Sequence, residues 1–187
     1  MIHIVTPYRE DRNLGRAYNE AFENCPEGDW LCLTDIDVLF LTPDAPRVMY
    51  EAIGLAPNAI FTCYTNRISP LAKEQSFFLK PNDVDSIQYH QSLAQKCIND
   101  PHPLYLVGRT DLSGFLLLVS KDTWKKYPFP EYMDKGGCIG VDTMWSRTIR
   151  AAQVPVLRMN RLYVWHTYRL GKEINDKTHL VNHESNI

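Results

Sequence analysis

Two aspartates one residue apart, Asp35 and Asp37, are the side chains whose types and spacing most directly suggest chemistry. They follow the apolar run 30–33, which has the composition of a buried strand, and a second apolar run, 38–41, comes directly after them. Side chains at positions i and i+2 of an extended chain point to the same side, so the two carboxylates would repel each other. A divalent cation with hard oxygen ligands removes this repulsion. A turn in which Asp35 caps local backbone groups is the alternative interpretation.

A histidine, His166, follows the run 161–165 and is the third candidate ligand. We expect this run to be a strand, and an imidazole at a strand end is unusual unless it has a partner. In open α/β sheets, ligands bind at the carboxyl ends of the strands. Two carboxylates and one imidazole around one cation suit Mn²⁺ or Mg²⁺, so we predict a metal site made by Asp35, Asp37 and His166.

Three arginines lie after the first expected strand, residues 2–6. Arg9 and Arg12 belong to a loop, and Arg16 lies in the first turn of the helix that follows, for which Asn13 is a plausible N-cap. A strand, a loop and a helix N-terminus in this order suit an anionic ligand. A solvated loop with surface arginines is the alternative for each arginine alone.

Two residues in the second half of the chain have both a functional and a structural interpretation. Gly114 stands near the start of the apolar run 113–119, where it would admit the close approach of a ligand or form a bulge. Asp142 lies in the first turn of an expected helix, where the helix dipole stabilises an acid without any chemistry. The loop 132–140 contains three glycines, and we expect it to close over a bound ligand.

Alternating strands and helices must position these residues. The patterns predict strands at 2–6, 30–33, 58–64, 113–119, 154–159 and 161–165, and helices at 14–22, 43–56, 69–78, 83–98 and 141–152, with a short helix starting at 120. This order predicts one α/β, Rossmann-like domain, with a mixed but mostly parallel sheet flanked by helices. The domain would span residues 1–170, and residues 171–187 would form a polar tail.

Composition limits the classes of protein to consider. The chain has 187 residues, of which 44% are hydrophobic and 22% charged, so it can build one domain with a substantial core. Its net charge of -2 gives no reason to expect a nucleic-acid partner. The five cysteines are widely spaced without a zinc pattern, which predicts reduced thiols and a cytoplasmic location. Neither a signal peptide nor an apolar run of membrane length is present, so we expect no membrane span.

Several short motifs, taken in order, resemble the glycosyltransferases of the GT-A fold. The resemblance is to the family-2 inverting enzymes and, for the last motif, to the polypeptide N-acetylgalactosaminyltransferases, and it spans residues 2–170. The motifs that carry it are Leu14-Gly15-x-Ala17-x-Asn19, Asp29-Trp30 leading into Asp35-x-Asp37, Ser113-Gly114-Phe115, Gly140-x-Asp142 and Val164-x-His166-x-x-Arg169. Their order makes the resemblance specific, because Asp-x-Asp alone is common.

The resemblance implies a GT-A-like domain and metal-dependent transfer of a sugar, with inversion, from a UDP- or GDP-linked donor to the hydroxyl of a glycan, lipid-linked or other acceptor. Asp37 and His166 would hold Mn²⁺ or Mg²⁺ on the diphosphate, and Asp142 would deprotonate the acceptor. The donor would be bound by Thr6, Pro7, Tyr8, Arg9, Arg16, Asp35 and Arg169.

This sequence departs from the family pattern in two places. Family-2 enzymes usually insert a second strand and an acidic, serine-rich turn where this chain passes directly from Tyr8 to Leu14, and Val141 stands where an acid is common. These departures predict a shortened glycosyltransferase. A nucleotidyltransferase is one competing class, although no Gly-rich, Lys-bearing phosphate loop follows the first strand. A sugar-nucleotide-binding protein without catalytic activity is the other.

Overall fold

The computed structural model describes residues 1–80, 82–108, 110–131 and 140–167. Strands and helices alternate along most of this part of the chain, as the sequence pattern predicts. The elements are β1 (Ile2–Val5), α1 (Leu14–Glu23), β2 (Trp30–Thr34), β3 (Val38–Phe40), α2 (Ala45–Leu55), β4 (Ile60–Thr65), the 3₁₀ helix η1 (Pro70–Gln75), α3 (Ile87–Cys97), β5 (Leu104–Leu106), β6 (Leu116–Ser120), α4 (Lys121–Lys126), α5 (Val141–Ala151) and β7 (Val156–His166). None of the helices in these ranges is both long and apolar enough to cross a membrane.

The strands form one open, mixed sheet. Among the described residues it has seven strands in the order β1-β2-β6-β4-β7-β3, with β5 paired to β7 beside this path. The pairs β1/β2 and β4/β7 are parallel, whereas β2/β6, β4/β6, β3/β7 and β5/β7 are antiparallel. The α/β class and the mixed sheet are therefore confirmed, but a mostly parallel sheet is not. The run that forms β6 is apolar throughout, and a buried apolar run has the same composition in either direction.

One strand stands where the sequence pattern predicted two. β7 continues through Asn160, the residue that separates the two predicted strands 154–159 and 161–165. Arg158 and Asn160 remain buried because they bond each other, with 2.9 Å between Arg158 Nε and Asn160 Oδ1. The guanidinium of Arg158 also lies 3.8 Å from the ring centre of Tyr64. Mutual pairing thus allows polar residues to occupy a buried strand.

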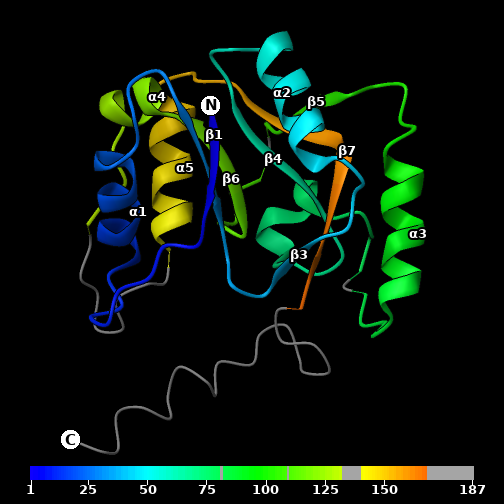
Figure 1. Cartoon of the computed structure of the whole chain (residues 1–187). Coiled ribbons are helices and arrows are strands. Elements are labelled where there is room, and N and C mark those ends of the chain that lie inside the picture. Colours follow the sequence, from blue (N-terminus) through cyan, green and yellow to red (C-terminus); the bar gives the residue numbers. More distant parts are fainter. Residues whose placement is uncertain (81, 109, 132–139, 168–187) are drawn as a thin grey trace, which may run out of the picture.

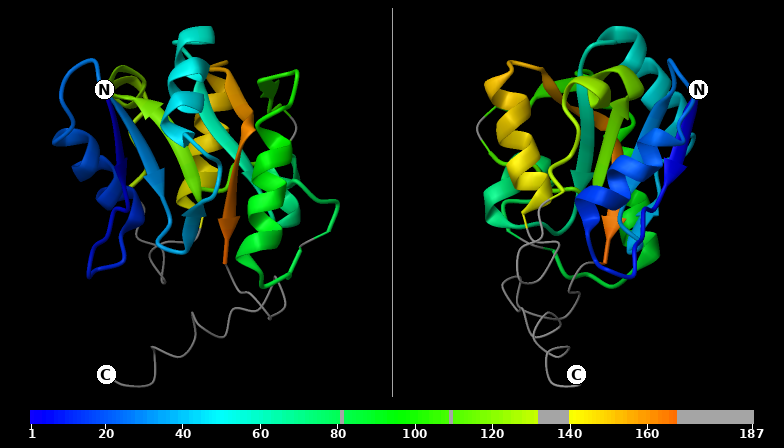
Figure 2. Two further views of the ribbon diagram at one scale, coloured as in Figure 1. Left: turned by 45° about the vertical axis from the view of Figure 1, so that its right-hand side comes forward. Right: turned by 90° about the vertical axis from the view of Figure 1, so that its left-hand side faces the viewer.

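Helices cover both faces of the sheet. On one face the core is built by α2 and by alternate strand residues such as Cys32, whereas Leu31 and Leu33 point to the other face and pack with α1 and α5. α3 packs on a third cluster that includes Tyr163 of β7. Figures 1 and 2 show this arrangement, with α1, α4 and α5 near the β1 end of the sheet and α3 at the opposite end.

One edge of the sheet collects the ends of several strands. β1, β2, β4 and β7 run in the same direction and finish at this edge, while the antiparallel strands β3 and β6 begin there. It is the lower edge in Figure 1. The Asp-x-Asp segment after β2 and the histidine at the end of β7 therefore meet on the same side of the molecule, where α/β proteins bind ligands.

Candidate metal and acid site

Asp35, Asp37 and His166 form a compact cluster at this edge. Their ligand atoms all lie within 4.8 Å of one another. His166 Nε2 is 3.2 Å from Asp37 Oδ1 and 3.8 Å from Asp35 Oδ2. The imidazole is buried, whereas the carboxylates are 41% exposed at Asp35 and 33% at Asp37. Two oxygen donors and one nitrogen donor, open to solvent on one side, fit Mn²⁺ or Mg²⁺ with room for further ligands.

Backbone pairing explains why the cluster forms. A tight turn from Asp35 to Val38 follows β2, and β3 then pairs antiparallel with the end of β7 so that Val38 lies opposite His166. Thr167 N donates to Asp37 O over 3.0 Å, which places the second aspartate beside the histidine. His166 lies 129 residues after Asp37 in the sequence. It is brought to the aspartates by a strand pair that the sequence pattern did not predict.

The charges of the cluster perturb one another. Burial raises the pKa of Asp35 to about 6; His166 acts against this rise, and the carboxylates of Asp37 and Asp142 add to it. At Asp37 burial also acts to raise the pKa, yet the net shift is downward because the imidazole of His166 bonds that carboxylate. The two aspartates therefore differ in their affinity for protons, and a bound cation would favour the charged form of both.

Asp142 lies near the cluster and is held by two backbone donors. Its Oδ2 accepts from Gly114 N and its Oδ1 from Thr143 N, both over 2.8 Å. Burial raises its pKa above the ordinary value even though both donors act to lower it. Because Asp142 also contributes to the raised pKa of Asp35, the predicted base and the predicted ligands share one region of negative charge. The bond from Gly114 N also fastens the start of α5 to the segment before β6.

The close approach expected at Gly114 is made by protein side chains. A Cβ atom at this position would lie 3.1 Å from the Tyr18 hydroxyl and 3.4 Å from Asp142 Cβ. Glycine thus leaves room for the carboxylate of Asp142 to reach the backbone N–H of residue 114. The alternatives weighed from the sequence, a ligand or a bulge, did not include this contact.

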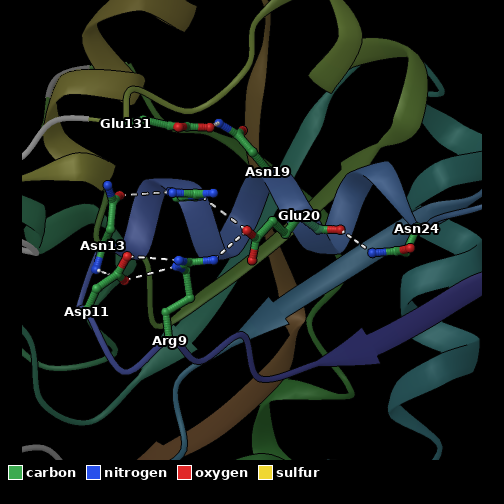
Figure 3. Close-up of polar contacts among 8 residues, drawn as sticks. Arg9, Asp11, Asn13, Asn19, Glu20, Asn24 and Glu131 are labelled. Carbon is green, nitrogen blue, oxygen red and sulfur yellow. Dashed lines mark hydrogen bonds and ion pairs between the residues drawn. The ribbon is translucent and has the colours of Figure 1, made fainter.

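Two of the three arginines expected to meet an anion, Arg9 and Arg16, are already paired with acids. Arg9 Nε and Nη2 each lie 2.9 Å from a carboxylate oxygen of Asp11, and Nη1 bonds Glu20. Arg16 Nε donates to the same Glu20 oxygen over 3.2 Å. Figure 3 shows the side chain of Arg9 between Asp11 of the loop after β1 and Glu20 of helix α1. A role of Arg9 and Arg16 in donor binding stays a prediction, and it requires the donor to compete with two carboxylates.

The segment expected to flank the nucleotide lies at the same edge. Thr6 Oγ1 is 3.1 Å from Oγ1 of Thr34, the residue before Asp35. Pro7 and Tyr8 follow, and the Tyr8 side chain is 81% exposed. Arg169 and residues 132–139 of the predicted lid lie outside the described residues, as does the tail 171–187.

The structure gives residues of the glycosyltransferase-like motif in α1 a packing role that the sequence analysis did not assign. A Cβ at Gly15 would lie only 2.0 Å from Pro130 O. One turn further, Asn19 Nδ2 donates to Phe129 O and to Glu131 Oε1, each over 2.9 Å, and Figure 3 shows the Asn19 and Glu131 side chains facing each other. The spacing of a glycine and an asparagine four residues apart, on one face of a helix, was the available signal.

Comparisons of the chain with protein-family models, with curated proteins and with solved structures give no match. The functional argument therefore rests on the fold and on the geometry of the site.

Proposed function

We propose that this protein transfers a sugar from a nucleotide-linked donor to an acceptor hydroxyl, with inversion and with help from Mn²⁺ or Mg²⁺. One observation carries the proposal: Asp35, Asp37 and His166 form a solvent-facing cluster at the carboxyl edge of the sheet, near Asp142. A GT-A-like assignment of the fold, a donor linked to UDP or GDP, and a glycan, lipid-linked or other acceptor belong to the same proposal.

The residues divide the chemistry in the following way. Asp37 and His166 would hold the cation, with Asp35 beside the metal or the ribose. A bound cation would supply positive charge to stabilise the leaving diphosphate. Asp142 takes the proton of the attacking hydroxyl. Its raised pKa makes it a better base than an ordinary surface aspartate. Thr6, Pro7 and Tyr8 would flank the nucleotide.

A thermal-shift panel of UDP- and GDP-sugars, with and without Mn²⁺, tests the metal-dependent donor site. A ligand at 100 times its dissociation constant stabilises the native state by about 2.7 kcal/mol, which for a domain of this size raises the melting temperature by about 5 to 10 °C. Asp37→Ala should abolish the Mn²⁺-dependent part of this shift. Asp122→Ala, an exposed acid at the start of α4, should leave it unchanged. An undiminished Mn²⁺ effect in Asp37→Ala would refute the metal assignment.

Donor hydrolysis separates the competing functions. A transferase leaks some sugar to water when Mn²⁺ is present, whereas a protein that only binds the donor releases none. A nucleotidyltransferase would instead release pyrophosphate from a nucleoside triphosphate. Release of sugar without pyrophosphate is the result that the proposal requires.

A further inference from the structure

The side chain of Asn66 connects three segments at the edge that carries the metal cluster. Asn66 is the first residue after β4 and is 0% exposed. Its Oδ1 accepts from His166 N over 2.9 Å and from Thr65 Oγ1 over 3.3 Å, while its Nδ2 donates to Asn82 O over 3.0 Å. One carboxamide therefore binds the end of β4, the end of β7 and the segment before α3.

The bond to His166 extends the pairing of β4 with β7 beyond its last backbone step. The parallel register of these strands ends at Thr65 opposite Val164. The next N–H on this side of β7 is that of His166, and it donates to the side chain of Asn66 instead of to a backbone carbonyl. On its other side His166 is paired with Val38 of β3. Its backbone is thus held from both neighbours, and its ring packs on Phe115 with 5.4 Å between ring centres.

We propose that Asn66 is a positioning residue for the metal centre, an inference that rests on the proposed function of Asp35, Asp37 and His166. By fixing the backbone of His166, Asn66 holds the imidazole nitrogen next to the aspartates before a cation arrives. Groups that orient the ligands of a metal in this way commonly contribute 10- to 100-fold to its affinity.

The chemistry of the site explains why the residue is an asparagine. A carboxamide accepts a hydrogen bond on its oxygen and donates one from its nitrogen at the same time. Aspartate could accept from His166 N but could not donate to Asn82 O, and it would add a carboxylate close to two others. Leucine has a similar size but would leave the buried N–H of His166 and the carbonyl of Asn82 without these bonds.

Isothermal titration calorimetry of the 187-residue protein with Mn²⁺ tests the proposal. We expect Asn66→Ala to bind Mn²⁺ about 10- to 100-fold more weakly than the parent and to exchange the amide hydrogen of His166 faster. Asn82→Ala is the matched control, because the side chain of Asn82 bonds Tyr89 and Val84, which lie outside the cluster of Asp35, Asp37 and His166. It perturbs the same segment and should leave the Mn²⁺ affinity unchanged.

Asn66→Asp provides a second variant that keeps the acceptor for His166 N. In this variant the His166 amide hydrogen should exchange as slowly as in the parent, and Mn²⁺ should bind at least as tightly. The variant therefore tests the proposal even when Asn66→Ala folds poorly. Parent-like Mn²⁺ affinity in Asn66→Ala, or equal weakening in Asn66→Asp and Asn66→Ala, would overturn the inference while leaving the metal site in place. A parent protein that binds no Mn²⁺ would overturn the proposed function itself.

Discussion

Replacing Asp142 by Asn should abolish sugar transfer at a modest cost in stability. The carboxylate accepts two backbone hydrogen bonds of 2.8 Å, from Gly114 and Thr143. A carboxamide has one oxygen, so one of these N–H groups would face the new NH₂ group. A hydrogen bond to a charged group contributes about 1.5 to 3 kcal/mol to the free energy of unfolding. Part of this loss is offset because the variant no longer buries a charge. We therefore expect the free energy of unfolding to fall by about 2 kcal/mol.

The expected loss of activity is larger than this loss of stability can produce. Removing a general base costs about 100- to 10,000-fold in rate. A domain with roughly 5 kcal/mol of stability that loses about 2 kcal/mol is still more than 99% folded, so unfolding would reduce transfer by only about 1%. Transfer at saturating donor, donor binding with Mn²⁺, and urea unfolding together distinguish the two effects.

The pH dependence of transfer by the parent protein is a further test, and a second acid provides the control. Because the pKa of Asp142 is raised, transfer should begin to fall at a higher pH than an ordinary aspartate would give, as acid protonates the base. Asp122→Asn, which removes a first-turn acid from α4, should retain full transfer. A folded Asp142→Asn protein that transfers sugar within a few-fold of the parent would refute the assignment. Asp111, whose carboxylate lies 3.1 Å from Arg147, would then be the next candidate.

Two further predictions concern stability. The pKa of Asp29 is lowered by the N-terminal ammonium group and by His3, whose Nε2 lies 2.8 Å away. The two contacts that lower this pKa stabilise the folded protein fully above the ordinary pKa of 3.8, and this stabilisation is lost as the pH falls through the lowered value. The difference in urea midpoint between the parent and Asp29→Asn should therefore become smaller in acid. Gly15→Ala should destabilise by about 1 to 3 kcal/mol because its Cβ would meet Pro130 O at 2.0 Å. Gly54→Ala in α2, with nothing within 4 Å, should instead stabilise by about 0.5 to 1 kcal/mol, and thermal unfolding of both variants checks the contrast.

The sequence allowed the meeting of Asp35, Asp37 and His166 to be predicted because these three residues follow strong apolar runs. Such runs identify strands, and parallel strands bring their carboxyl ends to one edge. Nothing in the prediction required knowing which strands are neighbours. The cluster therefore formed as expected, although the pair β3/β7 that aligns Asp37 with His166 was not predicted.

Strand direction and side-chain partners could not be predicted from local patterns. β6 is antiparallel to both neighbours, and its apolar residues would pack equally well in a parallel strand. Gly114 shows the same limit, since the carboxylate that it accommodates lies 28 residues further along the chain. Arg9 showed only that a cation was present, because its contact with Glu20 depends on how the loop after β1 folds back onto α1. The Arg16–Glu20 pair, in contrast, has the i, i+4 spacing that a helix brings together, so a local pattern could have indicated it.

The position of β7 in the sheet has a consequence for how the protein is made. β7 is the last strand in sequence among the described residues, yet it is the partner of β3, β4 and β5. During synthesis, a chain that has not yet reached Val156 exposes the apolar edge of β4 and leaves β3 and β5 without a neighbour. Such edges promote pairing between nascent chains. Ribosome-bound or truncated chains that stop before Val156 should therefore depend on chaperones. In a complete chain, the pairing of β7 with β3, β4 and β5 should end the tendency to aggregate.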